Sequence, residues 1–94
     1  MGVLTTEQER KIDGLFYAHA TGSVPLGWQS VLSCVWDKYR GSRRATAMRQ
    51  RYYCGKTQTE TRCDMNISLN SYFNWRMDFI VSAALEAARR GIDF

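Results

Sequence analysis

Apolar residues at helical spacing constrain the fold of this chain more than any other feature of its sequence. Between Trp28 and Tyr39 they occupy positions i, i+3, i+4, i+7, i+8 and i+11, which form one face of a helix packed on a core. The same spacing extends from Tyr72 to Ala88, and Gly91 then supplies a glycine stop. We find no segment with the alternating pattern of a strand. The sequence therefore predicts an all-α fold.

Capping and turn residues divide the chain into a small bundle of about five helices. Thr6 and Glu9 have the spacing of a capping box, in which two side chains bind free backbone N–H groups at a helix start. We expect a turn at Pro25–Gly27, and Gly55 stands where a helix ends in a left-handed conformation. The predicted helices cover about 6–20, 28–39, 43–54, 57–65 and 68–90. Because 94 residues suffice for one domain, we expect a single helical domain over 1–94.

Basic residues are concentrated in the middle of the chain. The basic segment, from Lys38 to Arg62, holds eight basic residues and one acidic residue, Glu60, so it carries a net charge of +7, whereas the whole chain carries +4. Positive potential of this kind is typical of surfaces that bind phosphates. The simpler alternative is a basic surface that contacts only solvent.

The residues from 57 onward have the signals of two helices joined by a tight turn. Thr57 and Glu60 have the spacing of a second capping box and mark the start of the first helix. Asn66 falls at the turn, where the backbone often needs a positive φ that Asn accepts more readily than other non-glycine residues. Ser68 would cap the second helix. The spacing predicts a helix-turn-helix over about 57–77, whose second helix continues as an apolar C-terminal helix to about residue 90.

This stretch resembles the helix-turn-helix of sigma-factor region four and of related phage regulators. There, a helix rich in arginine and tyrosine leads into a motif that reads Y-x-x-G-x-T-Q-x-E-x-A-x-x-L-G-I-S. The residues at these positions here are Tyr52, Gly55, Thr57, Gln58, Glu60, Arg62, Met65, Asn66, Ile67 and Ser68. The resemblance covers about residues 43–77, and in size and layout the chain is most similar to the small late-gene antiterminators of lambdoid phages. Arg62 departs from the motif by replacing a small residue: either the two helices open wider, or the arginine stem lies across the core with its head in solvent.

The resemblance implies that the second helix enters the major groove of double-stranded DNA with its amino-terminal residues at the base edges. The implied base contacts are Leu69, Asn70, Ser71, Asn74 and Arg76. The implied phosphate contacts, which position a protein without reading sequence, are Arg43, Arg44, Arg49, Arg51, Lys56, Thr57 and Gln58. The implied function is sequence-directed DNA binding by a transcription regulator, in particular a phage late-gene antiterminator that acts with RNA polymerase. The alternative is that Asn70 and Asn74 are ordinary helix residues that contact only solvent.

A second class of function, protein–protein interaction, fits the same region. The basic helical face would then bind a host protein, as a phage-like inhibitor or adaptor does. Apolar residues available for such contact include Trp75, Ile92 and Phe94, of which the last two dock either on their own core or on a partner. The apolar last helix (79–88) either closes the core of a monomer or forms the interface of a homodimer.

Other functions lack support in the sequence. His19 is the single histidine and has no evident carboxylate partner, and no phosphate-binding loop or hydrolase motif occurs, so we expect neither an enzyme nor a cofactor. Cys34, Cys54 and Cys63 are odd in number and lack zinc-finger spacing, so we expect reduced thiols, two of them buried, and no metal site. No run of about 18 apolar residues occurs, so we expect a cytoplasmic protein that does not span a membrane.

Overall fold

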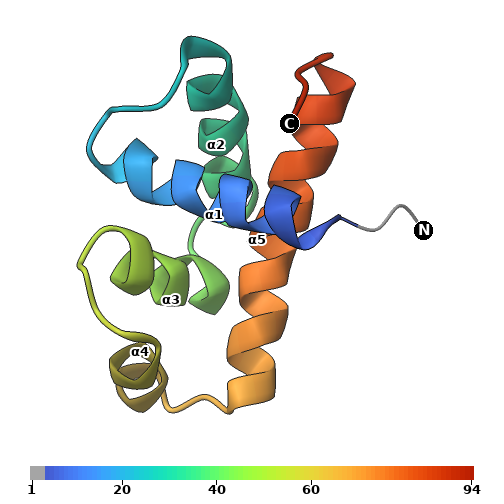
Figure 1. The fold of residues 1–94 in the computed structure, drawn as a ribbon. Coiled ribbons are helices and arrows are strands. Elements are labelled where there is room, and N and C mark those ends of the chain that lie inside the picture. The colour runs from blue at the N-terminus through green and yellow to red at the C-terminus, as the bar shows by residue number, and fades with distance from the viewer. Residues whose placement is uncertain (1–3) are drawn as a thin grey trace.

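The structure, a computed structural model, describes residues 4–94, which fold into five α-helices without a β-strand (Figure 1). In chain order these are α1 (Thr6–Ala20), α2 (Leu26–Lys38), α3 (Arg43–Tyr52), α4 (Gln58–Met65) and α5 (Leu69–Arg89). The predicted all-α fold is therefore confirmed. Within the described range, no helix is both long enough and apolar enough to span a membrane. The first three residues of the predicted 1–94 domain lie outside this range.

The central element of the fold is α5. In Figure 1 it runs along the length of the molecule, with α2 beside its C-terminal half, α1 across its middle and α4 near its N-terminal end. Phe79 from α5, Phe16 from α1 and Met48 from α3 are fully buried in one core. Each such side chain stabilises the fold by roughly 1.5–3 kcal/mol through removal of apolar surface from water. Because the core residues of α5 lie mostly in its C-terminal half, its first turns form one end of the molecule.

The residues that follow α5 return to this core. The ring of Phe94 meets the ring of Trp28 edge to face, with centroids 5.8 Å apart. The carbonyl oxygen of Phe94 also accepts a hydrogen bond from Gln8 Nε2 at 3.3 Å. Ile92 packs against buried residues as well. Of the two alternatives for Ile92 and Phe94, docking on the chain's own core is the one observed.

The capping box at the start of α1 lies one residue earlier than predicted. Thr5 is the N-cap: its Oγ1 accepts a hydrogen bond from the backbone N of Gln8 at 3.1 Å, and Gln8 Oε1 accepts one from the backbone N of Thr5 at 2.9 Å. The predicted box of Thr6 with Glu9 is therefore wrong. Two consecutive threonines, followed three residues later by Gln and by Glu, form two overlapping boxes that the local pattern does not distinguish.

Two other helix ends differ from the prediction. Pro25 has a φ of −57°, which suits the entry into a helix, so Leu26 and Gly27 join the first turn of α2 instead of forming a separate turn. The third helix ends at Tyr52, two residues before the predicted end. Gly55 is left-handed as predicted, with a φ of 71°.

All three cysteines are free and exposed. The expectation that two of them fill buried helix positions is therefore wrong. In α2 the buried positions near Cys34 are taken by Val31 and Val35, and in α4 the buried residue is Thr61 rather than Cys63. Cys34 and Cys63 thus lie beside the apolar faces of their helices, and Cys54 follows the end of α3.

Candidate nucleic-acid interface

The predicted start of α4 is observed. Thr57 Oγ1 accepts a hydrogen bond from the backbone N of Glu60 at 3.1 Å, and Glu60 Oε1 accepts one from the backbone N of Thr57 at 2.9 Å. The hydrogen bond from the backbone N of Thr57 stabilises the ionised carboxylate, so the pKa of Glu60 is lowered from its ordinary value. At this end of α4, Thr57 is exposed and Gln58 is half-buried.

A connection of three residues joins α4 to α5. Asn66 is left-handed, with φ 53° and ψ 54°, as the turn was predicted to require. The backbone N of Ile67 donates a hydrogen bond to the carbonyl oxygen of Arg62 at 3.1 Å, which closes the end of α4. Ser68 is the N-cap of α5, and its Oγ accepts a hydrogen bond from the backbone N of Ser71 at 3.1 Å. The local signals for the turn and for the second cap are therefore confirmed.

The helix α4 is attached mainly to α3. Thr61 is the buried residue of α4 and is fully covered. Arg43, the first residue of α3, donates a hydrogen bond to the carbonyl oxygen of Met65 at the end of α4. The guanidinium of Arg43 also lies 5.7 Å from the ring centre of Trp75, which is half-buried. Arg43 thus links α3, α4 and α5 at this end of the molecule.

Four of the five predicted base-contact residues lie together at the free end of α5. These four residues, called the α5 tip below, are the exposed Leu69, Asn70 and Asn74 and the half-buried Ser71. Arg76 is placed elsewhere: its Nε lies 3.3 Å from Asp13 Oδ1 on α1, and the two side chains are only 24% and 23% exposed. Helical spacing explains this, because Arg76 follows the buried Tyr72 by four residues and precedes the buried Ala83 by seven. The structure therefore directs Arg76 toward α1 and away from the α5 tip.

Among the predicted phosphate contacts, Arg51 is half-buried and bound to groups of the protein itself. Its Nε donates a hydrogen bond to Tyr72 Oη at 2.8 Å, and another guanidinium nitrogen donates to the carbonyl oxygen of Lys56 at 2.8 Å. The guanidinium lies 5.6 Å from the ring centre of Tyr17. Burial alone would lower the pKa of Arg51, but the hydrogen bond to Tyr72 and nearby groups raise it. Arg51 thus joins α3, the following loop, α5 and α1.

Acidic residues from outside the basic segment neutralise part of its charge. Arg44 Nε lies 2.8 Å from a carboxylate oxygen of Asp78, and Lys56 pairs with Asp64. Among residues 4–94, no carboxylate pairs with Arg49, and its guanidinium lies over the rings of Trp36 in α2 and of Tyr53 at the end of α3. The charge available to an external phosphate is therefore smaller than the +7 that the sequence assigns to the segment.

Arg62 was not among the predicted phosphate contacts, yet its side chain has no hydrogen-bond partner among the described residues. Its Nε is buried and has no hydrogen-bond partner. Arg62 lines an open hollow of about 330 Å³. The other lining residues are Thr59, Cys63, Asn66 and Ile67. The sequence did carry a signal for this residue, because Arg62 stands where the sigma-like motif has a small residue. An arginine at such a position must either be buried at a cost in free energy or find a partner.

The outer side of α5 carries an apolar strip. Its residues, four apart along the helix, are Phe73, Met77, Val81 and Leu85. Three of them are exposed large hydrophobic side chains, with Leu85 the most exposed at 66%, and Met77 is half-buried. Contiguous exposed apolar surface on a small protein is typical of an interaction site.

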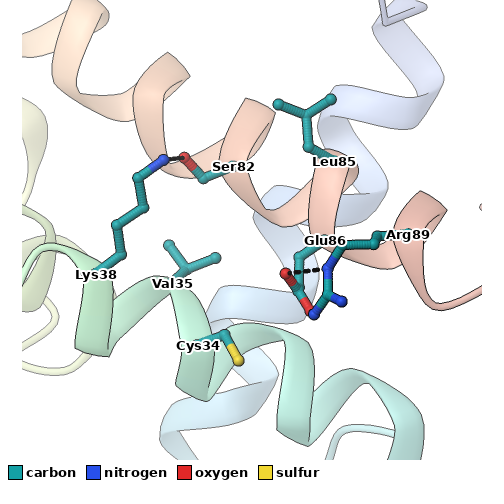
Figure 2. Close-up of a pocket in the computed structure, with 7 residues that line it drawn as sticks. All are labelled: Cys34, Val35, Lys38, Ser82, Leu85, Glu86 and Arg89. Atoms are coloured by element: carbon teal, nitrogen blue, oxygen red, sulfur yellow. Dashed lines mark hydrogen bonds and ion pairs between the residues drawn. The ribbon is translucent and has the colours of Figure 1, made fainter.

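A hollow between α2 and α5 borders this strip (Figure 2). Lys38 Nζ reaches across it and donates a hydrogen bond to Ser82 Oγ at 3.3 Å. Hydrogen bonds from Arg89 and then Arg90 lower the pKa of Glu86 to about 2. The charged groups of this hollow are thus engaged within the protein, which makes it a border of the apolar strip rather than a separate ligand site.

The single histidine, His19, lies in the last turn of α1. His19 Nδ1 lies 2.6 Å from Tyr53 Oη, and burial lowers the pKa of the imidazole. Among residues 4–94, no three His, Cys, Asp or Glu side chains gather in a way that would hold a metal ion. Comparison with protein-family models, with curated proteins and with solved structures finds no match to this chain.

Proposed function

We propose that the protein is a transcription regulator that contacts double-stranded DNA with the α5 tip. The observation that carries the proposal is the exposure of Asn70 and Asn74 at the amino-terminal end of a helix that a three-residue turn separates from α4. An asparagine amide can bind the N6 and N7 atoms of adenine together, and an apolar side chain such as Leu69 suits a thymine methyl group. The sequence resemblance to sigma-factor region four supports this orientation. It also suggests the particular role, a cytoplasmic phage late-gene antiterminator acting with RNA polymerase.

The ion pairs within the protein limit how many phosphates it can contact. Arg44 and Lys56 are paired with carboxylates, and Arg51 is tied to Tyr72. Exposed groups such as Arg49 and Thr57 remain. We therefore expect about two to four phosphate contacts and a correspondingly shallow salt dependence, near 0.9 units of slope for each contact.

Fluorescence anisotropy with random duplex DNA at several salt concentrations tests the proposal. We expect micromolar binding that weakens with salt, followed by selection of a preferred site. At that site, the double variant Asn70→Ala/Asn74→Ala should lose discrimination, by roughly 1–3 kcal/mol for each bidentate contact removed. Gln29→Ala, an exposed polar residue on α2, is the matched control and should bind as the wild type does. Absence of duplex binding by the wild type at low salt would contradict the proposal.

The apolar strip favours a second candidate function, binding to another protein. That protein is either a second copy of this chain or a host protein such as RNA polymerase. Asn74, Val81 and Leu85 share the outward side of α5, so a partner packed along the whole strip would also cover part of the α5 tip. The two candidate functions therefore compete for one side of one helix.

Charge substitutions within the strip separate the two candidates. Val81→Lys/Leu85→Lys should abolish an apolar interface, and light scattering would show loss of a dimer where one exists. If the strip binds RNA polymerase, the same variant should no longer capture RNA polymerase in a pull-down. If DNA binding by the α5 tip is the function, the variant should still bind the selected duplex.

A further inference from the structure

Arg62 differs from the other basic residues of the basic segment in having no partner. Among the described residues, Arg40, Arg44 and Lys56 pair with carboxylates, and the remaining four bind a hydroxyl, a carbonyl oxygen or an aromatic ring. No hydrogen bond, ion pair or aromatic contact within residues 4–94 involves the side chain of Arg62. Its Nε is nevertheless shielded from solvent. Among the described residues this N–H donor has no acceptor, and a buried donor left unpaired is costly.

The hollow beside Arg62 suits an anion. Thr59, Arg62, Cys63 and Asn66 are spaced as one face of α4, so their side chains border the same space. The lining includes a hydroxyl from Thr59 and an amide from Asn66, both hydrogen-bond donors, and it includes no carboxylate. The hollow between α2 and α5 differs in this respect, because Glu86 lines it.

A guanidinium in such a hollow matches the geometry of a phosphate group. The guanidinium presents several N–H donors in a planar fork, and these can bind two phosphate oxygens at once. Thr59 and Asn66 can add neutral hydrogen bonds to the same group. The volume of about 330 Å³ is open on one side, so a phosphate that is part of a chain can enter it.

The position of the hollow relates it to the α5 tip. Asn66 and Ile67, which line the hollow, belong to the turn that leads into α5. Asn70 follows Asn66 by four residues. We therefore expect a DNA strand whose bases reach Asn70 to have its backbone near the hollow. Such a backbone contact fixes the register of a protein on the duplex without reading sequence.

We propose that Arg62, with Thr59 and Asn66, binds a phosphate of the DNA backbone in the hollow beside α4. This inference rests on the proposed function and names one of its backbone contacts. A phosphodiester and free inorganic phosphate share the chemistry that the hollow recognises. The test must therefore separate these two sources.

The test compares Arg62→Gln and Arg62→Lys with Arg40→Gln, an exposed arginine paired with Asp37 at the end of α2. Arg62→Gln should weaken binding to random and selected duplexes alike, by about tenfold, and lower the salt slope by about 0.9. Arg62→Lys retains the charge but loses the fork, so it should keep the slope and recover part of the affinity. Arg40→Gln should leave both quantities unchanged. Circular dichroism melting of each variant reports whether the fold is intact.

Proton–nitrogen NMR spectra of the wild type identify the source of the phosphate. The Arg62 Nε–H signal should shift on addition of duplex at low salt and should respond only weakly to millimolar inorganic phosphate. If the wild type binds duplex but Arg62→Gln keeps the wild-type slope, the proposal for Arg62 is overturned while the proposed function stands. If the wild type binds no duplex but its Arg62 signal responds to inorganic phosphate, the DNA assignment fails together with the proposed function, and a free phosphate is the ligand.

Discussion

Replacement of Asp13 by alanine should destabilise the protein more than the loss of a surface ion pair would, because Asp13 binds two other side chains. Asp13 Oδ1 accepts a hydrogen bond from Tyr52 Oη at 2.6 Å and lies 3.3 Å from Arg76 Nε. Tyr52 is only 5% exposed, and burial together with Asp13 raises its pKa well above the ordinary value. Asp13→Ala removes the acceptor for both groups, so a buried hydroxyl and a half-buried guanidinium are left unpaired.

The magnitude follows from these two losses. An unsatisfied buried hydroxyl costs about 1–3 kcal/mol, and loss of a partly buried ion pair adds about 1 kcal/mol. We therefore expect the free energy of unfolding to fall by about 2–4 kcal/mol. For a domain of this size, each kcal/mol shifts Tm by roughly 4–8 °C, so the Tm of Asp13→Ala should drop by about 10 °C or more.

Urea unfolding followed by far-UV circular dichroism measures this loss, and a double-mutant cycle assigns it. The cycle combines Asp13→Ala with Tyr52→Phe, which removes the hydroxyl without leaving it unpaired. We expect a coupling energy of about 1 kcal/mol or more between the two sites. Asp37→Ala is the control, because Asp37 pairs with Arg40 on the surface and such pairs contribute about 0–1 kcal/mol. Additive effects of Asp13→Ala and Tyr52→Phe would refute the reasoning.

Three further predictions concern the turn, the cap of α4 and the histidine. Asn66→Ala should lower the stability by about 1–2 kcal/mol because its φ is 53°, whereas Asn66→Gly should be close to wild type, as urea unfolding would show. Thr57→Ala should cost about 1 kcal/mol in the same assay, and the pKa of Glu60, followed by NMR titration, should rise toward its ordinary value. Burial lowers the pKa of His19 in the folded state, so stability should be constant above about pH 6.5 and fall below it, where the unfolded chain binds the proton more readily. His19→Asn should remove this dependence between about pH 5 and 7, and Tyr53→Phe should keep it, when urea midpoints are compared across that range.

The parts of the structure that the sequence predicted are those set by neighbouring residues. The cap at Thr57, the left-handed Asn66 and the cap at Ser68 each depend on contacts within three or four residues, and all three are confirmed. The same local logic failed at the start of α1, where Thr5 and Thr6 offer competing caps. Local signals thus located the five helices but not every helix end, since α2 begins at Leu26 and α3 ends at Tyr52.

The parts that the sequence did not predict depend on contacts between distant segments. Arg44 meets Asp78 and Arg76 meets Asp13 because helices far apart in the chain pack together. A count of charge along the sequence cannot include these partners, so it overstated the charge that the basic segment exposes. Arg76 lies away from the α5 tip for the same reason, since its helical face turns toward α1.

The same contacts indicate why the α5 tip can serve as a rigid recognition element. The C-terminal half of α5 supplies core residues such as Phe79 and Ile80, while Arg51 and Arg76 fix its N-terminal half to α3 and α1. A helix held in this way cannot rotate to change which side chains face outward. The side that carries Asn74 also carries the apolar strip, so a protein partner and DNA would approach α5 from the same direction. Binding to DNA weakens with salt, whereas burial of the apolar strip does not. The dependence of the binding affinity on salt concentration therefore distinguishes the two functions of α5 before any partner is identified.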